Sequence, residues 1–327
     1  MGGSQSIIGT VFGQLTQAGE YGKDGYQKHS SSWDPKEMDV DLTGKHIFIS
    51  GGSSGIGKQA ALDLARKNGN IHIMCRNKEK GEAVRQELVE ASGNTNISLH
   101  TLDVSSMESV RAFARNILES DIPVNALIHN AGALTVKRNE TPEGNEQTLA
   151  THVLGPHLLT ALLEDRLKSS ENAHVIFVSS AGMYSVKMDL NNMQANKAYD
   201  GTMVYANNKR MQIYLMEMWA ERLKGVVRVN AMHPGWTVTP GLDSLFEDKP
   251  MYKKFESSFR SVEGGADTIV WMTVAEKLKK TTGKFFFDRA EAKTHVRLAC
   301  TQSSTSEQKK LWNACCELTG WKEGVQA

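Results

Sequence analysis

The chain has 327 residues, of which 40% are hydrophobic and 23% charged, with 28 glycines and 7 prolines. This composition excludes a disordered or collagen-like protein, and the length suffices to bury a sizeable core. The net charge of +1 gives no overall field that would attract nucleic acid, so we expect no nucleic-acid partner. Four cysteines form neither a disulfide framework nor a CxxC pair, which favours a reducing, cytoplasmic compartment and no metal site.

Composition changes near residue 44. We expect an N-terminal arm over residues 1–43, a catalytic domain over 44–290 and an extension with a terminal helix over 291–327. Gly2 and Ser6 stand at the spacing of an N-myristoylation signal, which would give the arm a weak peripheral membrane contact. The alternative is an untethered polar terminus. No apolar run approaches the roughly 20 residues that span a bilayer.

From residue 44 onward, short apolar runs alternate with helical periodicity. Seven runs predict buried strands: His46–Ser50, Asn70–Cys75, Ile97–Asp103, Val124–His129, His174–Ser179, Val226–Met232 and Lys284–Phe287. Six patterns between them predict helices: Ile56–Lys67, Lys78–Ala91, Ser106–Ser120, Asn145–Lys168, Thr202–Leu223 and Ala266–Lys279. A capping box at Ser304 and Glu307 predicts a last helix. The alternation predicts an α/β fold with one doubly wound parallel sheet and helices on both faces.

A glycine-rich turn follows the first predicted strand and precedes a helix. Glycines tighten such a turn and let a pyrophosphate approach the backbone, while the helix N-terminus offers free N–H groups. A tight structural turn is the alternative, but the strand–turn–helix context favours a dinucleotide site. The candidate residues are Gly51, Ser53, Ser54, Gly55, Ile56 and Gly57.

The second predicted strand ends in Cys75 and Arg76. Dinucleotide folds that prefer NAD usually place an acid there to hold the ribose 2′-hydroxyl. An arginine pairs instead with a 2′-phosphate, and therefore NADP(H) is the expected cofactor. A solvated arginine at the end of a strand is the alternative.

Further polar residues follow the later strands. Asp103 and Val104 close the third, and Asn130 and Gly132 follow the fourth, where ligands of parallel sheets bind. Ser180 follows the fifth strand. Tyr205 and Lys209 are four residues apart and share a helix face, so the ammonium favours the phenolate. Taken alone, a tyrosine and a lysine at this spacing are most often an exposed pair without a catalytic role.

Taken together, these motifs resemble the short-chain dehydrogenase/reductase family over about residues 42–290. The resemblance rests on the order and spacing of five motifs: Gly51-x-x-x-Gly55-Ile56-Gly57, Asn130-Ala131-Gly132, Ser180, Tyr205-x-x-x-Lys209 and His233-Pro234-Gly235. It implies that Tyr205 is the general acid/base, that Lys209 binds the nicotinamide ribose, and that Ser180 binds the substrate oxygen.

The resemblance also assigns the remaining cofactor contacts. Asn130 and Gly132 would shape the floor of the site, and Asp103 and Val104 would meet the adenine end. After the Pro234-Gly235 turn, Thr237 or Thr239 would meet the carboxamide or a phosphate. Family members often form homodimers through the helices around His152 and Tyr205, which makes a homodimer the expected assembly.

One position departs from the family pattern. The family usually has a catalytic asparagine in an Asn-x-x-Gly pattern, where this chain has His152-Val153-Leu154-Gly155. An imidazole could still hold the water that links the lysine to solvent, and it could also carry a proton. Alternatively, His152 is a packed helix residue and the relay is weakened.

The sequence therefore predicts an NADP(H)-dependent oxidoreductase that exchanges a hydride with an alcohol or carbonyl. The aromatic segment 241–262 is expected to form a lid over a lipophilic substrate, or else a helix packed on the core. A second hypothesis, prompted by His152, is a cofactor-binding regulator or adaptor with little turnover.

Overall fold

The computed structural model describes residues 18–197, 199–237, 257–296 and 299–323. Three predicted features lie wholly or largely outside these residues: the Gly2/Ser6 lipidation pattern, Thr239, and most of the segment 241–262.

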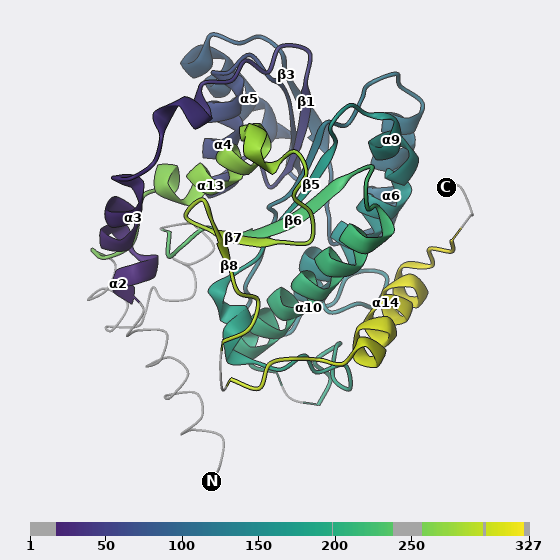
Figure 1. Ribbon diagram of the computed structural model, residues 1–327. Coiled ribbons are helices and arrows are strands. Elements are labelled where there is room, and N and C mark those ends of the chain that lie inside the picture. The colour runs from purple at the N-terminus through teal and green to yellow at the C-terminus, as the bar shows by residue number, and fades with distance from the viewer. Residues whose placement is uncertain (1–17, 198, 238–256, 297–298, 324–327) are drawn as a thin grey trace.

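One twisted sheet runs through the described part of the molecule (Figure 1). Its strands stand in the order β3-β2-β1-β4-β5-β6-β7-β8, in which every neighbouring pair is parallel except β7 and β8. The strands are β1 (His46–Ser50), β2 (Asn70–Cys75), β3 (Ile97–Thr101), β4 (Ala126–His129), β5 (His174–Val178), β6 (Arg228–His233), β7 (Phe285–Phe287) and β8 (Ala290–Ala292). The predicted doubly wound fold is confirmed. The sequence missed β8, a strand of three residues that starts at the predicted domain boundary.

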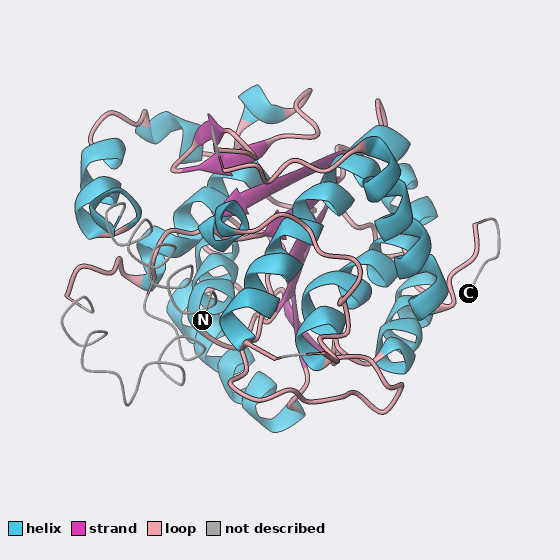
Figure 2. Ribbon diagram, turned by 90° about the horizontal axis from the view of Figure 1, so that it is seen from below, coloured by secondary structure: helices cyan, strands magenta, loops and turns pink. Residues whose placement is uncertain are grey.

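Helices cover both faces of the sheet (Figures 1 and 2). On one face lie α4 (Gly55–Ala65), α5 (Lys78–Ser92) and α13 (Val262–Val274). On the other lie α6 (Met107–Leu118), α8 (Gly155–Leu162), α9 (Glu164–Ser169) and α10 (Gly201–Arg222). Short 3-10 turns follow β5 (η3, Ala181–Ser185) and α13 (η4, Glu276–Leu278). Within the described residues, no helix is long and apolar enough to cross a membrane.

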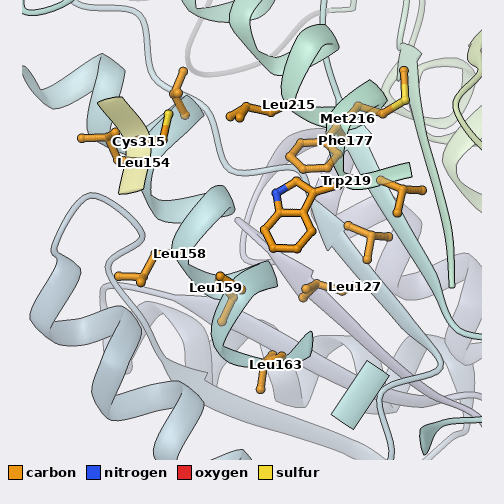
Figure 3. Packing of buried hydrophobic residues seen from close by; sticks show 14 of the residues in the cluster. Leu127, Leu154, Leu158, Leu159, Leu163, Phe177, Leu215, Met216, Trp219 and Cys315 are labelled. Atoms are coloured by element: carbon orange, nitrogen blue, oxygen red, sulfur yellow. The ribbon is translucent and has the colours of Figure 1, made fainter. Parts of the chain in front are cut away.

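Two buried clusters, one on each face, hold the layers together. Alternation along β1 divides them, because Phe48 belongs to the cluster beneath α6, α8 and α10, whereas Ile47 and Ile49 belong to the cluster beneath α4 and α13. Figure 3 shows the first cluster around Trp219, whose indole lies among leucines of α8 and Phe177 of β5. Met211, Met216 and Trp219 are fully buried, as expected of packing residues.

The predicted helix 145–168 is interrupted. It comprises α7 (Gln147–Leu149), a π-helical turn η2 (Ala150–Leu154), α8 and α9. Pro156 has no N–H to donate to the carbonyl of His152, one turn earlier, and the Gly155 N–H bonds to Ala150 across the wider π turn. The Gln212 side chain of α10 donates to the His152 carbonyl instead, at 2.8 Å.

The two ends of the chain contribute helices outside the sheet layers. Before β1 lie α2 (Ala18–Tyr21), α3 (Lys23–Ser30) and the 3-10 turn η1 (Pro35–Met38). After β8 comes α14 (Thr305–Thr319), which begins at the predicted Ser304/Glu307 capping box and lies along α10 (Figure 1). Trp312 of α14 contacts Trp219 of α10, with ring centres 4.9 Å apart.

Candidate active site

The carboxyl ends of β1 to β6 bring the predicted site residues to one edge of the sheet. The order of the strands reverses between β1 and β4, where the crevice of such folds receives its ligand. Gly51 follows β1 on one side of this switch point and Asn130 follows β4 on the other. They are neighbours, since a Cβ on Gly51 would lie 3.1 Å from the Asn130 amide nitrogen.

The glycine turn is shaped by close backbone contacts. Gly51 and Gly55 have φ values of +67° and +52°, a region that favours glycine. A Cβ on Gly57 would lie 2.3 Å from the Asn130 amide nitrogen and 2.5 Å from the Gly51 carbonyl oxygen. Ser54 stands at the N-cap of α4 but makes no capping hydrogen bond with its side chain. The first N–H groups of α4 are thus available to an anion.

Asn130 fixes the turn after β4 to the turn after β1. Its side-chain amide donates to the Ser50 carbonyl at 2.9 Å, and its own N–H donates to the Ser50 hydroxyl at 3.0 Å. The Ala131 N–H donates to the same hydroxyl, also at 3.0 Å. Gly132 is exposed beside this network. Ser50 is a site residue that the sequence analysis assigned only to the strand, because nothing local marks its second role.

The adenine end of the predicted site lies at β2 and β3. Arg76 is exposed directly after β2, which suits contact with a phosphate. Asp103 is bound within its own loop, where its carboxylate accepts from the Ser105 N–H at 2.9 Å and the Ser105 hydroxyl at 2.6 Å. Val104 is buried. A Cβ on Gly155 would lie only 1.9 Å from the Val104 carbonyl oxygen. The glycine of the His152–Gly155 pattern therefore permits close packing with the loop after β3.

Tyr205, Lys209 and Ser180 come together between β5 and α10. The Lys209 ammonium lies 5.4 Å from the centre of the Tyr205 ring and donates to the Val178 carbonyl at 2.8 Å. Ser180 and Tyr205 are neighbours, since a Cβ on Gly182 would lie 3.5 Å from the Ser180 oxygen and 3.8 Å from the Tyr205 ring. The Ser180 oxygen accepts from the Gly182 N–H at 3.1 Å. Asp200 caps α10, accepting from the N–H groups of Thr202 and Met203, and so fixes the start of the helix that carries the pair.

Burial dominates the titration of this pair. It lowers the pKa of Lys209 from 10.5 to about 7, because the ammonium is removed from water. Burial also raises the pKa of Tyr205, and the hydrogen bond from Ser180 opposes that rise. With the protein's own groups alone, the tyrosine is therefore a phenol at neutral pH, ready to donate a proton.

His152 lies beside Tyr205, with ring centres 5.3 Å apart and planes nearly perpendicular. The Ala133 N–H donates to His152 Nε2 at 3.0 Å. Since Nε2 accepts, a neutral ring carries its proton on Nδ1, which is buried and has no hydrogen-bond partner among the described residues. Burial and Lys209 lower the pKa of His152 well below 6.5, so the ring is neutral at physiological pH.

The turn after β6 forms the remaining wall. Pro234 and Gly235 lead into Thr237, which is buried and donates through its hydroxyl to the Pro234 carbonyl at 3.1 Å. A Cβ on Gly265 of α13 would lie 2.5 Å from the Thr237 hydroxyl oxygen and 3.1 Å from the Ile56 side chain. Gly265 thus packs against both the turn after β6 and the glycine turn.

Besides Ser50, sequence reasoning missed three further groups that support the site. The Ala133 N–H and the Gln212 amide hold the ring and the carbonyl of His152. Pro156 is the sequence signal for the Gln212 contact, because it has no N–H to donate to the His152 carbonyl four residues earlier. Arg260, the third, is buried against Gly235 and has no local sequence pattern that identifies it.

The model of the short chain dehydrogenase family matches residues 45–250. The chain belongs to this family. Dehydrogenase/reductase SDR family member 12 from Bos taurus is 39% identical over 294 residues, covering 89% of this chain and 92% of that protein. Retinol dehydrogenase 12 from Bos taurus is 34% identical over 283 residues, covering 86% and 88%.

Solved structures share the fold. A putative uncharacterized protein from Mycobacterium paratuberculosis aligns with a TM-score of 0.69 and 22% identity, covering 88% of this chain and 97% of that one. A putative short chain dehydrogenase from Escherichia coli CFT073, complexed with NADPH, aligns with a TM-score of 0.61 and 23% identity, covering 78% and 100%. As a member of the family, the chain is an oxidoreductase that uses a nicotinamide cofactor and a small-molecule substrate.

The observed site fits a dinucleotide. The N-terminus of α4 has no side-chain cap, and the backbone around Gly51 and Gly57 leaves no room for a Cβ. On the other side of the switch point, Tyr205 and Lys209 lie on one face of α10, with the ammonium 5.4 Å from the centre of the ring. Within the described residues, no group of three His, Cys, Asp or Glu side chains could hold a metal ion.

Proposed function

We propose that the protein is an NADP(H)-dependent oxidoreductase that interconverts a lipophilic alcohol and its carbonyl. The observation that carries this proposal is the grouping of Ser180, Tyr205 and Lys209 at the strand ends that also present the glycine turn. A neighbouring serine and tyrosine beside a buried ammonium suit proton transfer to a carbonyl oxygen.

Each residue has a separate task in the reductive direction. Bound NADPH supplies the hydride from its nicotinamide ring. Ser180 and Tyr205 hold the carbonyl oxygen, and Tyr205 donates the proton as negative charge develops there. The Lys209 ammonium then stabilises the phenolate. His152 stays neutral and holds a water through its Nδ1–H, replacing the asparagine of the family pattern.

The preference for NADP(H) rests on Arg76. This exposed guanidinium follows β2, where NAD-dependent relatives of the fold place a carboxylate. An arginine at that position pairs with a 2′-phosphate through two parallel hydrogen bonds. The NADPH complex of the structurally similar Escherichia coli protein supports the same choice.

The proposed substrate class comes from the relatives. Retinol dehydrogenase 12 is named for a lipophilic alcohol, and its 34% identity extends over 86% of this chain. We propose a substrate of similar character. Association of part of the protein with membranes would suit such a substrate. We propose a myristoyl group on Gly2 as the anchor, because Gly2 and Ser6 have the spacing of that signal. Changing Gly2 to Ala should then move that fraction into the cytosol, as measured by fractionation of eukaryotic cells.

Cofactor binding and turnover test the proposal separately. NADPH should raise the melting temperature more than NADH does, because a ligand that binds the native state stabilises it. NADPH oxidation should then follow addition of a carbonyl compound from a panel of retinals, steroids and fatty aldehydes. Stabilisation by NADPH without oxidation by any member of the panel would favour the alternative, a cofactor-binding regulator or adaptor. A melting temperature unchanged by all nicotinamide cofactors would refute both.

A further inference from the structure

The N-terminal arm contacts the turn that follows β6. The Trp236 N–H donates to the Tyr21 carbonyl at 2.9 Å, and the Lys23 N–H donates to the Ser258 carbonyl at 2.8 Å. The Tyr21 ring also packs edge-on against His233, at the end of β6, with ring centres 4.9 Å apart. The backbone between α2 and α3 is thereby joined to the turn after β6 and to Ser258, two residues before Arg260.

Arg260 lies at the centre of this junction, with only 1% of its side chain exposed. Its Nε donates to the Tyr21 carbonyl at 2.9 Å, and a terminal nitrogen donates to the Gly22 carbonyl at 3.3 Å. The guanidinium also forms a two-bond pair with Asp288, at 2.6 and 3.2 Å. One buried cation thus joins the arm to the hairpin of β7 and β8.

The same arginine lies against the proposed cofactor turn. Gly235 has a φ of +74°, and a Cβ there would lie 2.2 Å from the Arg260 Nε. The Arg260 N–H donates to the Trp236 carbonyl at 2.8 Å, and Thr237 and Arg260 form an isolated parallel bridge. Arg260 therefore determines how close the backbone of Gly235 to Thr237 lies to the body of the protein.

Asp288 is placed for this contact by an unusual turn. Asp288 and Arg289 are the two residues that link β7 to β8, and their φ values are +47° and +59°. Side chains other than glycine adopt this conformation only where their surroundings hold them. Asp288 is held by Arg260 and by His29 of α3, whose Nδ1 lies 2.8 Å from the carboxylate.

We infer that Arg260 and Asp288 are positioning residues for the cofactor, and that the arm from Tyr21 to His29 is part of the active-site support. The inference rests on the proposed function. The arm carbonyls and Asp288 hold the guanidinium, and the guanidinium holds the Gly235–Thr237 turn against the Ile56 end of the glycine turn. Loosening this arrangement should weaken cofactor binding although no changed residue touches the cofactor.

A second ion pair offers a matched control. Arg289 donates to the Asp267 carboxylate through two nitrogens, at 2.7 and 2.5 Å, and its guanidinium stacks on Trp33 of the arm at 4.1 Å. The ion pair joins the hairpin to α13, and the stacking on Trp33 joins the same hairpin to the arm, with 8% of the Arg289 side chain exposed. The Gly235–Thr237 turn is not among its contacts.

The experiment compares Arg260→Lys with Arg289→Lys in the full chain. Lysine keeps the charge of each pair but cannot form the fork of parallel hydrogen bonds. NADPH affinity is measured by fluorescence titration, and kcat and KM by NADPH oxidation. Arg260→Lys should raise the Kd and the KM for NADPH by about tenfold, within the range typical of coupled sites, with a smaller change in kcat. Arg289→Lys should leave both constants near the wild-type values.

The outcomes separate the inference from the proposed function. A wild-type protein that does not bind NADPH refutes the proposed function. A wild-type protein that binds, together with an Arg260→Lys variant that binds equally well, refutes the inference alone. Equal losses in both variants would assign the effect to docking of the arm in general and refute the specific positioning role of Arg260 and Asp288. If Arg260→Lys does not fold, Asp288→Asn, which keeps the shape and the arm contacts of Arg260, replaces it under the same criteria.

Hydrogen exchange in the unmodified protein gives an independent test. If arm docking favours cofactor binding, then cofactor binding must favour arm docking by the same factor. NADPH should therefore slow amide exchange in a peptide that contains the hydrogen-bonded Lys23 N–H. Exchange in this peptide that is unchanged at saturating NADPH would overturn the coupling.

Discussion

The Lys209 ammonium lies 5.4 Å from the centre of the Tyr205 ring, in surroundings that lower the pKa of the lysine to about 7. Burial is the cause, so added negative charge should reverse the effect. The anionic phosphates of a nicotinamide cofactor would raise this pKa and keep the lysine charged above pH 7.

Cofactor binding should therefore take up protons. At pH 8 Lys209 is mostly neutral in the protein alone, and the complex would bind up to one more proton. Since the complex holds more protons, the affinity for NADPH should fall as the pH rises above about 7. Calorimetry in two buffers of different ionisation enthalpy measures the uptake. It should vanish in Lys209→Met, and zero uptake by the wild-type protein at pH 8 would contradict the pKa argument.

Replacement of Tyr205 by Phe tests the proton donor. The change removes only the phenol hydroxyl, whose pKa the nearby Ser180 lowers against the effect of burial. Turnover should fall by about 100- to 10,000-fold, the usual contribution of a positioned acid or base. The Kd for NADPH, measured by fluorescence titration, should change little. Ser180→Ala is the companion variant, expected to reduce turnover while leaving the phenol in place. Wild-type turnover in Tyr205→Phe would exclude this residue as the acid.

His152 should act without changing its charge. Its pKa is far below neutral, so His152→Asn should stay active and should leave the pH profile of turnover unchanged between about pH 6 and 9. His152→Leu removes the acceptor for the Ala133 N–H and should reduce turnover. A titration near neutrality in the wild-type protein that disappears in His152→Asn would instead assign a proton-carrying role to the imidazole.

Replacement of Arg76 by Ala tests cofactor choice. The change should remove a charge-assisted contact of about 1.5–3 kcal/mol, and thus weaken NADPH binding by roughly 10- to 150-fold. Binding of NADH should be nearly unaffected, because it has no 2′-phosphate. Lys78→Ala, a nearby exposed position at the start of α5, serves as a control for general loss of charge. Equal wild-type affinities for the two cofactors would remove the basis for the prediction.

The sequence predicted most of the fold because local signals sufficed. The runs at β1 and β2 match the structure at both ends, since each is a buried strand with two isoleucines that is followed directly by turn residues. The strand β8 was missed because its three residues, Ala-Glu-Ala, are largely exposed and include no β-branched or aromatic side chain. Helices α2 and α3 were missed because Gly19, Gly22 and Gly25 argue against a helix when the body of the protein is out of view.

Local signals likewise identified some residues of the candidate site and missed others. Tyr205 and Lys209 could be found from their spacing on one helix, and Gly51 to Gly57 from their place between a strand and a helix. Gln212 reaches His152 across 60 positions of sequence, and Arg260 reaches Tyr21 across 239. Such partners are chosen by the packing of whole elements, so no spacing rule in the sequence identifies them.

The packing of α14 against α10 has a consequence for synthesis of the protein. The helix begins at Thr305, near the end of the chain, yet Leu311 and Cys315 belong to the same buried cluster as Trp219. Because α14 follows the sheet and its other helices in the chain, the ribosome releases these residues only after those elements have left the exit tunnel. The indole of Trp219 therefore lacks its contacts with α14 until that helix has been synthesised. A nascent chain that stalls before Thr305 would expose this aromatic surface to chaperones.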